Sequence, residues 1–254
     1  MKSYRADLHI HTVLSPCGDL DMSPGTIVKK AKAAGLDIIG ITDHNSTRHC
    51  NLVSELAAEE NIYVLCGAEV NTSEEVHCLC FFPDFQKLNL FQEYLDQHLP
   101  DIKNDPDRFG YQVQVDEEEQ IVYQEEKLLI SAINQSIDQV EAKTHELEGL
   151  FIPAHIDRQR FSLISQLGFI PDDLDCDALE ISRHADLDKL RISNTSIGNS
   201  TLIRSSDAHF IEDIGKCVSE FYIKEATFDD VRLALQGENG RYVTLMVPSS
   251  KNLI

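Results

Sequence analysis

The chain has 254 residues, a length that suits one large α/β barrel or two small domains. Its 22 Lys and Arg residues against 43 Asp and Glu residues give a formal net charge of −21, which disfavours non-specific binding to duplex DNA or to anionic membranes. An apolar fraction of 42% is sufficient for a core and excludes wholesale disorder.

The sequence lacks the usual signals of secretion and membrane insertion. Residues 1–7 carry no apolar stretch of a signal peptide, and no apolar run approaches the roughly 18 residues of a membrane span. The seven cysteines form no CxxC pair, so a secreted disulfide framework is a poor interpretation. We therefore expect a cytoplasmic protein whose cysteines mostly fill small core positions: Cys50, Cys66, Cys78, Cys80, Cys176 and Cys217.

In chain order, the hydrophobic pattern predicts strands that alternate with helices. The first half is expected to contain strands at 4–10, 36–42, 62–70 and 76–82, and helices at 26–34, 47–60 and 85–98. The second half is expected to contain helices at 136–147, 187–192 and 228–235, and strands at 150–154, 178–182, 202–205, 220–223 and 242–247.

One segment, 100–127, breaks this alternation. It is acidic and has few large apolar residues, so we expect an exposed insertion, for which a short hairpin is one form. The rest indicates a single α/β domain over 1–254, built as a closed, irregular barrel. An open doubly wound sheet is the alternative, but the glycine-rich phosphate loop that often marks one is missing.

Side chains that bind metals gather at the expected strand ends. Asp7, His9 and His11 follow one another at a spacing of two, which would place all three on one face of an extended strand. Two imidazoles and a carboxylate at a strand end can hold a transition metal, although locally hydrogen-bonded histidines are the plainer alternative. Asp207 and His209 repeat this spacing after a later strand.

The intervening strands carry further ligand-type residues. Taken alone, Asp43 and His44 suit a turn, Glu69 a solvated carboxylate, and His77 a hydrogen-bonded core residue. With His155 they place ligand-type side chains at six strand C-termini, the edge where α/β barrels assemble active sites. About eight ligands would suit two or three metal ions, whereas one structural zinc needs four.

The ordered set resembles the motifs of the PHP superfamily (polymerase and histidinol phosphatase), from residue 5 to about 215. The motifs are Asp7-Leu8-His9-Ile10-His11, Thr42-Asp43-His44, Glu69, His77, Pro153-Ala154-His155 and Ser206-Asp207-Ala208-His209. The resemblance implies a distorted, seven-stranded (βα)7-type barrel with a trinuclear metal cluster and phosphoesterase activity.

The resemblance also implies which residues hold each metal ion. The ligands would be His9, His11, Glu69 and Asp207 for the first ion, Glu69, His77 and His155 for the second, and His44, His209 and the position six residues after His11 for the third. Many members have His at that last position, but here it is Cys17. A thiolate suits zinc or iron better than manganese, and Asp19 is another candidate for the position.

For two or three such ions (zinc, manganese or iron), we expect phosphate-ester hydrolysis by a hydroxide that bridges two metals. Asp207, Glu69 and His209 are the residues expected to act through it.

Three further residues are expected to support this chemistry. Asp7 and Asp43 are candidates to orient ligand imidazoles, with a turn or cap role as an equal alternative. Arg158 is a candidate to bind the substrate phosphate, the alternative being a surface salt bridge with Asp157 or another acid.

The expected substrate is a small phosphate ester, such as a nucleotide, a sugar phosphate or an amino-alcohol phosphate. No basic stripe or aromatic platform for a long nucleic acid is present. The alternatives are a nuclease acting on short oligonucleotides, a non-catalytic metal-binding module and an amidohydrolase-type hydrolase. The last often has a carbamylated lysine where Glu69 stands, and Lys127 and Lys143 fall in the insertion and in a helix.

Four histidines have no ligand-type partner at a matching spacing. His49, His98, His145 and His184 are interpreted as solvated surface residues. Of these, His184 comes closest to a strand end.

Overall fold

The computed structural model describes residues 1–246. Its main sheet has seven strands in the order β11-β10-β1-β2-β3-β4-β7, and two smaller sheets pair β5 with β6 and β8 with β9. The strands are β1 (Lys2–Ile10), β2 (Ile38–Ile41), β3 (Tyr63–Asn71), β4 (His77–Phe82), β5 (Val113–Val115), β6 (Ile121–Gln124), β7 (Leu150–Pro153), β8 (Leu179–Ile181), β9 (Leu202–Arg204), β10 (Ser219–Ile223) and β11 (Tyr242–Leu245). The α-helices are α1 (Pro24–Ala33), α2 (Cys50–Glu59), α3 (Phe85–His98), α4 (Pro106–Phe109), α5 (Ile137–Glu146), α6 (Leu163–Leu167), α7 (Leu187–Ser193) and α8 (Phe228–Leu235).

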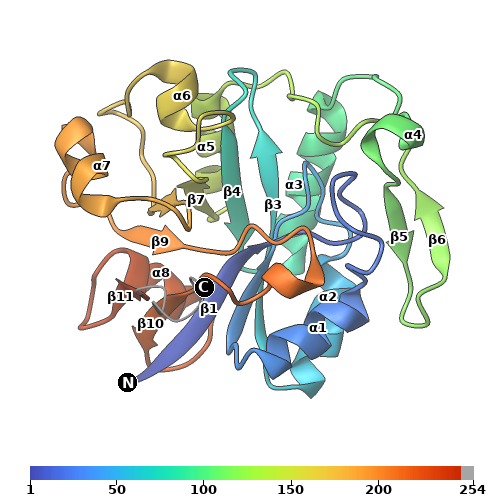
Figure 1. Cartoon of the computed structure of the whole chain (residues 1–254), viewed down its shortest axis with the longest axis horizontal. Coiled ribbons are helices and arrows are strands. Elements are labelled where there is room, and N and C mark those ends of the chain that lie inside the picture. Colours follow the sequence, from blue (N-terminus) through green and yellow to red (C-terminus); the bar gives the residue numbers. More distant parts are fainter. Residues whose placement is uncertain (247–254) are drawn as a thin grey trace, which may run out of the picture.

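The main sheet curls into a distorted barrel with helices around it (Figure 1). β1, β2 and β3 are parallel, whereas β4, β7 and β10 each run antiparallel to the strands they pair with in this sheet. The β8–β9 pair joins the two ends of the curl. Ile156 N, just after β7, donates to Glu180 O of β8, and Arg204 N of β9 donates to Ser219 Oγ of β10. This arrangement confirms the predicted distorted α/β barrel.

Two apolar cores follow from the alternation of side chains along the strands. Ile38 packs in a cluster inside the barrel, where α8 closes one end, while its neighbour Ile39 belongs to the cluster between the strands and the outer helices. Phe81 and Phe221 are fully buried in the inner cluster. Successive strand residues point to opposite faces, so one short apolar strand supplies both cores.

Most predicted elements are present within a few residues. α1 begins at Pro24, because the hydroxyl of Ser23 accepts a hydrogen bond from Thr26 N and caps the helix. α2 begins later than predicted, since Thr47 N and Oγ1 both donate to Gln92 Oε1 instead of continuing a helix. The last predicted strand ended at Val247, which lies outside the described residues.

The 100–127 segment contains the β5–β6 hairpin, which lies at the right-hand edge of Figure 1. All four residues of β6 are exposed, as expected for an insertion. The expectation is wrong for β5, because Val113 and Val115 are buried in a small cluster with Val13 of the loop after β1. The hairpin therefore packs against the part of the chain that follows the predicted ligands His9 and His11.

All seven cysteine thiols are free. Five of the six predicted core cysteines are buried, Cys176 is half-buried and Cys17 is exposed. No helix within residues 1–246 is both long and apolar enough to cross a bilayer.

Candidate metal centre

The predicted ligands meet at one end of the barrel. His9 and His11 lie at the end of β1, Glu69 lies near the end of β3, and a β-bridge joins Glu69 to His44 after β2. His77 is a correction, because it opens β4 instead of ending it. β4 runs antiparallel to β3, so its first residue lies at the same edge as the last residues of β3.

A bulge in β1 divides the Asp7, His9 and His11 motif. The register against β2 shifts between Asp7 and Ile10, so Leu8 packs inside the barrel and Ile10 packs outside it. His9 and His11 face each other with their Nε2 atoms 3.2 Å apart. The predicted role of Asp7 in orienting imidazoles is wrong, since its carboxylate accepts hydrogen bonds from the backbone N–H groups of Ser206 and Gly215.

Glu69 is the centre of the cluster. Its Oε1 lies 2.8 Å from His77 Nδ1, 3.2 Å from His155 Nε2 and 3.3 Å from His9 Nε2. Its Oε2 lies 3.1 Å from His44 Nδ1 and 3.4 Å from His11 Nε2. Each oxygen thus faces its own set of imidazoles, which is the geometry of a carboxylate that can bridge two ions.

Two of the predicted ligands have unusual backbone conformations. Asp207 has a φ of 51° and His155 a φ of 30°, both in the left-handed region that residues other than glycine rarely adopt. Such strain is retained where the surrounding structure fixes it, often at functional sites. As a result, Asp207 Oδ1 lies 3.3 Å from both His9 Nε2 and His11 Nε2.

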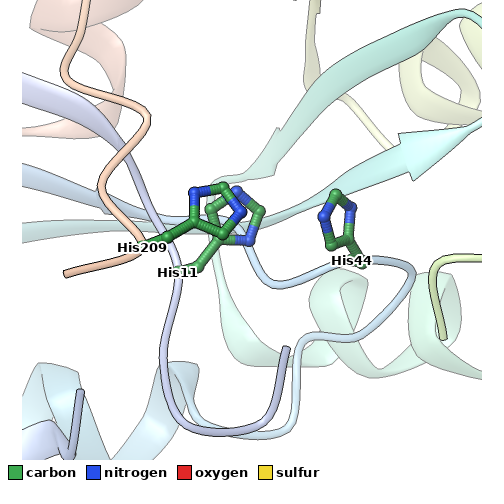
Figure 2. A group of neighbouring side chains, drawn as sticks. All are labelled: His11, His44 and His209. Atoms are coloured by element: carbon green, nitrogen blue, oxygen red, sulfur yellow. The ribbon is translucent and has the colours of Figure 1, made fainter. Parts of the chain in front are cut away.

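A second face of the cluster is formed by His11, His44 and His209 (Figure 2). The rings of His11 and His209 stack with centroids 4.1 Å apart, and the His44 centroid lies 4.6 Å from that of His11 and 6.1 Å from that of His209. One nitrogen from each ring lies within 4.8 Å of the others. Cys17 is exposed and belongs to none of the ligand groups that meet this spacing, so its role as a ligand stays a prediction.

Hydrogen bonds at Nδ1 leave Nε2 free on three of the rings. His9 Nδ1 donates to Glu180 Oε2 at 3.0 Å, and His209 Nδ1 donates to the carbonyl of Asp207 at 3.0 Å. His11 Nδ1 lies 3.0 Å from Ser15 Oγ, whose own proton goes to Asp43 Oδ1 at 2.7 Å. The Asp43 carboxylate is therefore linked to the His11 ring through Ser15, and its orienting role stays a prediction.

Glu180 and Ser15 contact the predicted ligands but were not among the site residues predicted from the sequence. Glu180 is 2% exposed in a strand of otherwise apolar residues, and a buried glutamate needs a partner. That single carboxylate inside the predicted strand 178–182 was the available signal. Ser15 had no comparable signal, because a serine in a loop is common.

The cluster fits divalent metal ions. Zinc ligand atoms lie about 2.1 Å from the ion, so two ligands of one tetrahedral ion are about 3.4 Å apart. The separations of His9 Nε2 and His11 Nε2 from each other and from Asp207 Oδ1 are 3.2 Å and 3.3 Å. Among the described residues, the buried atoms without a hydrogen-bond partner include His44 Nδ1, His155 Nδ1 and Asp207 Oδ1. Buried polar atoms left in this state are costly unless another group engages them.

The electrostatics of the cluster are those of a cation site. Burial raises the pKa of Glu69, but the surrounding histidines, His77 first, hold it well below the usual range. Burial lowers the pKa of His11, yet the carboxylates of Asp207 and Glu69 beside its ring raise it to about 9. Two buried carboxylates thus attract positive charge, which protons or metal ions can supply.

Arg158 lies at the rim of the cluster. Its guanidinium Nη2 is 2.5 Å from Asp207 Oδ2, and the side chain is 45% exposed. The alternative of a salt bridge with an acid is thus formed with Asp207 and not with Asp157, whose carboxylate accepts hydrogen bonds from the N–H and hydroxyl of Ser182. An open pocket of about 430 Å³ beside it is lined by His77, His155, Arg158, Gln159, Arg160 and Phe161.

The expectation of a solvated surface residue is wrong for one of the four remaining histidines. His49 is completely buried, with hydrogen bonds to Thr12 Oγ1 and Val115 N. His184 is exposed, as predicted, and His98 and His145 are half-buried. The predicted helix 47–60 included His49, whereas α2 begins at Cys50. The sequence pattern therefore did not show that the His49 side chain is buried.

Relatives of known sequence or structure match most of the chain. YqxK of Bacillus subtilis, an uncharacterized protein, is 25% identical over 96% of this chain and 64% of its own length. The lesion-specific endonuclease PfuEndoQ from Pyrococcus furiosus has a similar fold, with a TM-score of 0.71 at 21% identity over 95% of this chain and 58% of the endonuclease. A Bifidobacterium adolescentis protein proposed to be a metal-dependent phosphoesterase gives a TM-score of 0.57 at 22% identity, covering 91% of this chain and 96% of that one. The chain thus spans less than two thirds of YqxK and of PfuEndoQ.

Family models match two parts of the chain. The PHP-associated model matches residues 203–238, which include Asp207 and His209. The PHP domain model matches residues 7–162, more than half of the chain, and includes the ligands from His9 to His155. This protein therefore belongs to the PHP domain family.

Proposed function

We propose that this protein is a metal-dependent phosphoesterase. The observation that carries the proposal is Glu69, whose two carboxylate oxygens face separate sets of imidazoles in a fully buried position. Divalent ions held there would lower the pKa of a bound water and neutralise the charge of a phosphoryl group. The proposed ligands are His9, His11, His44, Glu69, His77, His155, Asp207 and His209, with Cys17 as a further candidate.

Side chains around the proposed metal centre orient the histidine ligands and supply a positive charge for the substrate. Glu180 fixes His9, and Ser15 fixes His11, so that both Nε2 lone pairs point into the centre. We propose that Arg158 binds a phosphoryl oxygen, because its guanidinium is half-exposed and lies against Asp207. The ion pair with Asp207 would loosen once that carboxylate is engaged by a cation.

A small phosphate ester is the substrate we favour. The pocket beside His77 and His155 has two arginines, Arg158 and Arg160, and the ring of Phe161 stacked on His77 with centroids 4.9 Å apart. Its volume of about 430 Å³ is within the range of small-molecule sites. The formal charge of −21 disfavours long polyanions, whose flanking phosphates would meet acidic surface.

A nuclease is the second candidate. It is favoured by the fold similarity to PfuEndoQ, which extends over 95% of this chain. The arginines at the pocket rim would then bind phosphates that flank the scissile bond. Both candidates use the same metal centre and differ in the size of substrate that the pocket accepts.

An amidohydrolase is a poorer candidate. Glu69 stands at the centre of the ligands, and neither lysine considered from the sequence is near it. Lys127, at the end of the 100–127 segment, donates through Nζ to the carbonyl of Leu99, and Lys143 pairs with Glu146 on α5.

The test is a substrate comparison on metal-loaded protein. Manganese- or zinc-loaded enzyme should hydrolyse p-nitrophenyl phosphate and at least one compound of a panel of nucleotides, sugar phosphates and amino-alcohol phosphates. Oligonucleotides, single-stranded and duplex with or without an abasic site, form the second arm. Cleavage confined to the oligonucleotides would establish the nuclease, and inactivity of metal-replete protein towards every phosphoester would reject the phosphoesterase.

A further inference from the structure

A continuous chain of buried hydrogen bonds connects the β5–β6 hairpin to the metal ligand His11. Val115 N of β5 lies 3.0 Å from His49 Nε2, and His49 Nδ1 lies 2.6 Å from Thr12 Oγ1. Thr12 Oγ1 lies 2.7 Å from Asp43 Oδ2. On the other carboxylate oxygen, Asp43 Oδ1 lies 2.7 Å from Ser15 Oγ, which is 3.0 Å from His11 Nδ1. All six residues are less than 10% exposed: His11, Thr12, Ser15, Asp43, His49 and Val115.

The direction of every hydrogen bond in this chain is fixed. The backbone N–H of Val115 is a donor, so His49 Nε2 accepts, and the proton of neutral His49 is on Nδ1 and is donated to Thr12 Oγ1. The hydroxyls of Thr12 and Ser15 donate to Asp43, because an ionised carboxylate only accepts. Ser15 Oγ must then accept from His11 Nδ1, which leaves His11 Nε2 for the metal centre.

The burial of His49 agrees with its neutral role. Burial lowers the pKa of His49, although the nearby Asp43 carboxylate opposes this effect. A second proton on His49 would have to occupy Nε2 and would point at the Val115 N–H. The hairpin therefore docks onto a neutral imidazole whose tautomer is already determined.

We propose that the β5–β6 hairpin positions the metal ligand His11 through His49, Thr12, Asp43 and Ser15. This inference rests on the proposed function in one respect, that His11 binds metal. The outer strand of the hairpin, β6, is exposed, and its inner strand, β5, contacts the hydrogen-bond chain. The position of the hairpin would thereby influence the orientation of the His11 ring in the metal centre. His49 and Thr12 are positioning residues, because neither touches the cluster itself.

The test compares variants that break different links. Val115→Pro removes the N–H group that donates to His49 Nε2. Val115→Ala keeps this N–H group and measures the effect of losing the valine side chain alone. His49→Leu removes both contacts, whereas His49→Asn retains a donor towards Thr12 and releases the hairpin. Thr12→Val breaks the hydrogen-bond chain in its middle. Its matched control is Thr144→Val, since Thr144 is equally buried and its hydroxyl donates to Val140 O of its own helix, away from the metal centre.

Two readouts separate positioning from mere stability. Zinc and manganese affinity, measured by competition with a chromophoric chelator, should fall about tenfold in Val115→Pro, His49→Leu, His49→Asn and Thr12→Val, the lower end of what loss of ligand support costs. The imidazole ¹⁵N–¹H spectrum of metal-free protein should show a slowly exchanging His11 Nδ1–H in wild type, Val115→Ala and Thr144→Val, and faster exchange in the four chain variants.

The outcomes distinguish this inference from the proposed function. If the chain variants lose unfolding free energy but keep wild-type metal affinity and His11 exchange, the hairpin only packs and the inference is rejected. If wild-type protein binds no metal, the proposed function fails, while the exchange of His11 Nδ1–H still tests the hairpin link. If Val115→Pro behaves as Val115→Ala in both readouts, the hairpin is not coupled to His11.

Discussion

The carboxylate of Glu180 lies 3.0 Å from Nδ1 of His9, and both side chains are at most 2% exposed. Burial lowers the pKa of His9, but Glu180, Asp207 and Glu69 together raise it well above the ordinary value. We therefore expect Glu180 to fix the orientation of the His9 ring and to increase its affinity for a cation, as carboxylates behind metal-binding histidines do.

Replacing Glu180 should therefore weaken metal binding without unfolding the protein. Glu180→Gln retains an acceptor for His9 Nδ1 and should lower metal affinity about tenfold, whereas Glu180→Leu should lower it about a hundredfold. Chelator competition measures both, and Glu238→Gln on the exposed surface is the control. Equal affinity of all three variants would contradict an orienting role for Glu180.

Asp207 should be required for activity and dispensable for folding. Asp207→Ala removes a carboxylate that lies 3.3 Å from two histidine Nε2 atoms, so the centre should lose an ion and phosphoester hydrolysis should fall at least a hundredfold. The far-ultraviolet circular dichroism spectrum should be unchanged. Collapse of the fold in this variant, together with an inactive wild type, would instead favour a module that binds metal for stability alone.

Arg158 should contribute to substrate binding. A charge-assisted hydrogen bond to phosphate is worth about 1.5–3 kcal/mol, so Arg158→Ala should lower kcat/KM roughly tenfold to a hundredfold. Arg158→Lys should recover only part, because an ammonium does not reproduce the guanidinium fork. Arg191→Ala, an exposed arginine on α7, is the control. Unchanged kcat/KM in Arg158→Ala would assign the residue to the ion pair with Asp207 alone.

His145 should make stability depend on pH. A hydrogen bond with Asp177 raises the pKa of His145, so this contact stabilises the folded protein fully below the unfolded pKa of about 6.5 and is lost as pH rises through the folded value. Urea unfolding of His145→Gln should show a loss of about 0.5–1 kcal/mol at pH 5.5 that shrinks by pH 9. The same loss at both pH values would mean that packing, not charge, is what the variant removes.

Cys17 can be tested as a metal ligand by spectroscopy. If its thiolate binds a metal ion, Co²⁺-substituted protein should show a near-ultraviolet thiolate charge-transfer band that Cys17→Ser abolishes. The buried cysteines are all outside the ligand groups, so Cys80→Ser serves as the control. A band that survives in Cys17→Ser would assign the thiolate to another residue, and its absence from wild type would exclude Cys17.

Most of the helices and strands, and most of the residues that gather in the cluster, could be predicted from the sequence. Short apolar strands and capped helices depend on local chemistry, as Ser23 and Pro24 illustrate at the start of α1. His9, Glu69, His155 and Asp207 could be chosen because ligand-type residues at strand ends are unusual in combination. Their convergence follows from the barrel, which brings those ends to one edge.

The side chains that surround the predicted ligands could not be inferred from local sequence. A bulge that the sequence does not reveal separates Asp7 from His9, and antiparallel pairing places His77 at the start of its strand beside Glu69. Glu180 and His49 reach their partners across 171 and 66 residues, so no local spacing could pair them. Hydrogen bonds between distant segments depend on how the elements pack, and packing is settled only when the whole barrel closes.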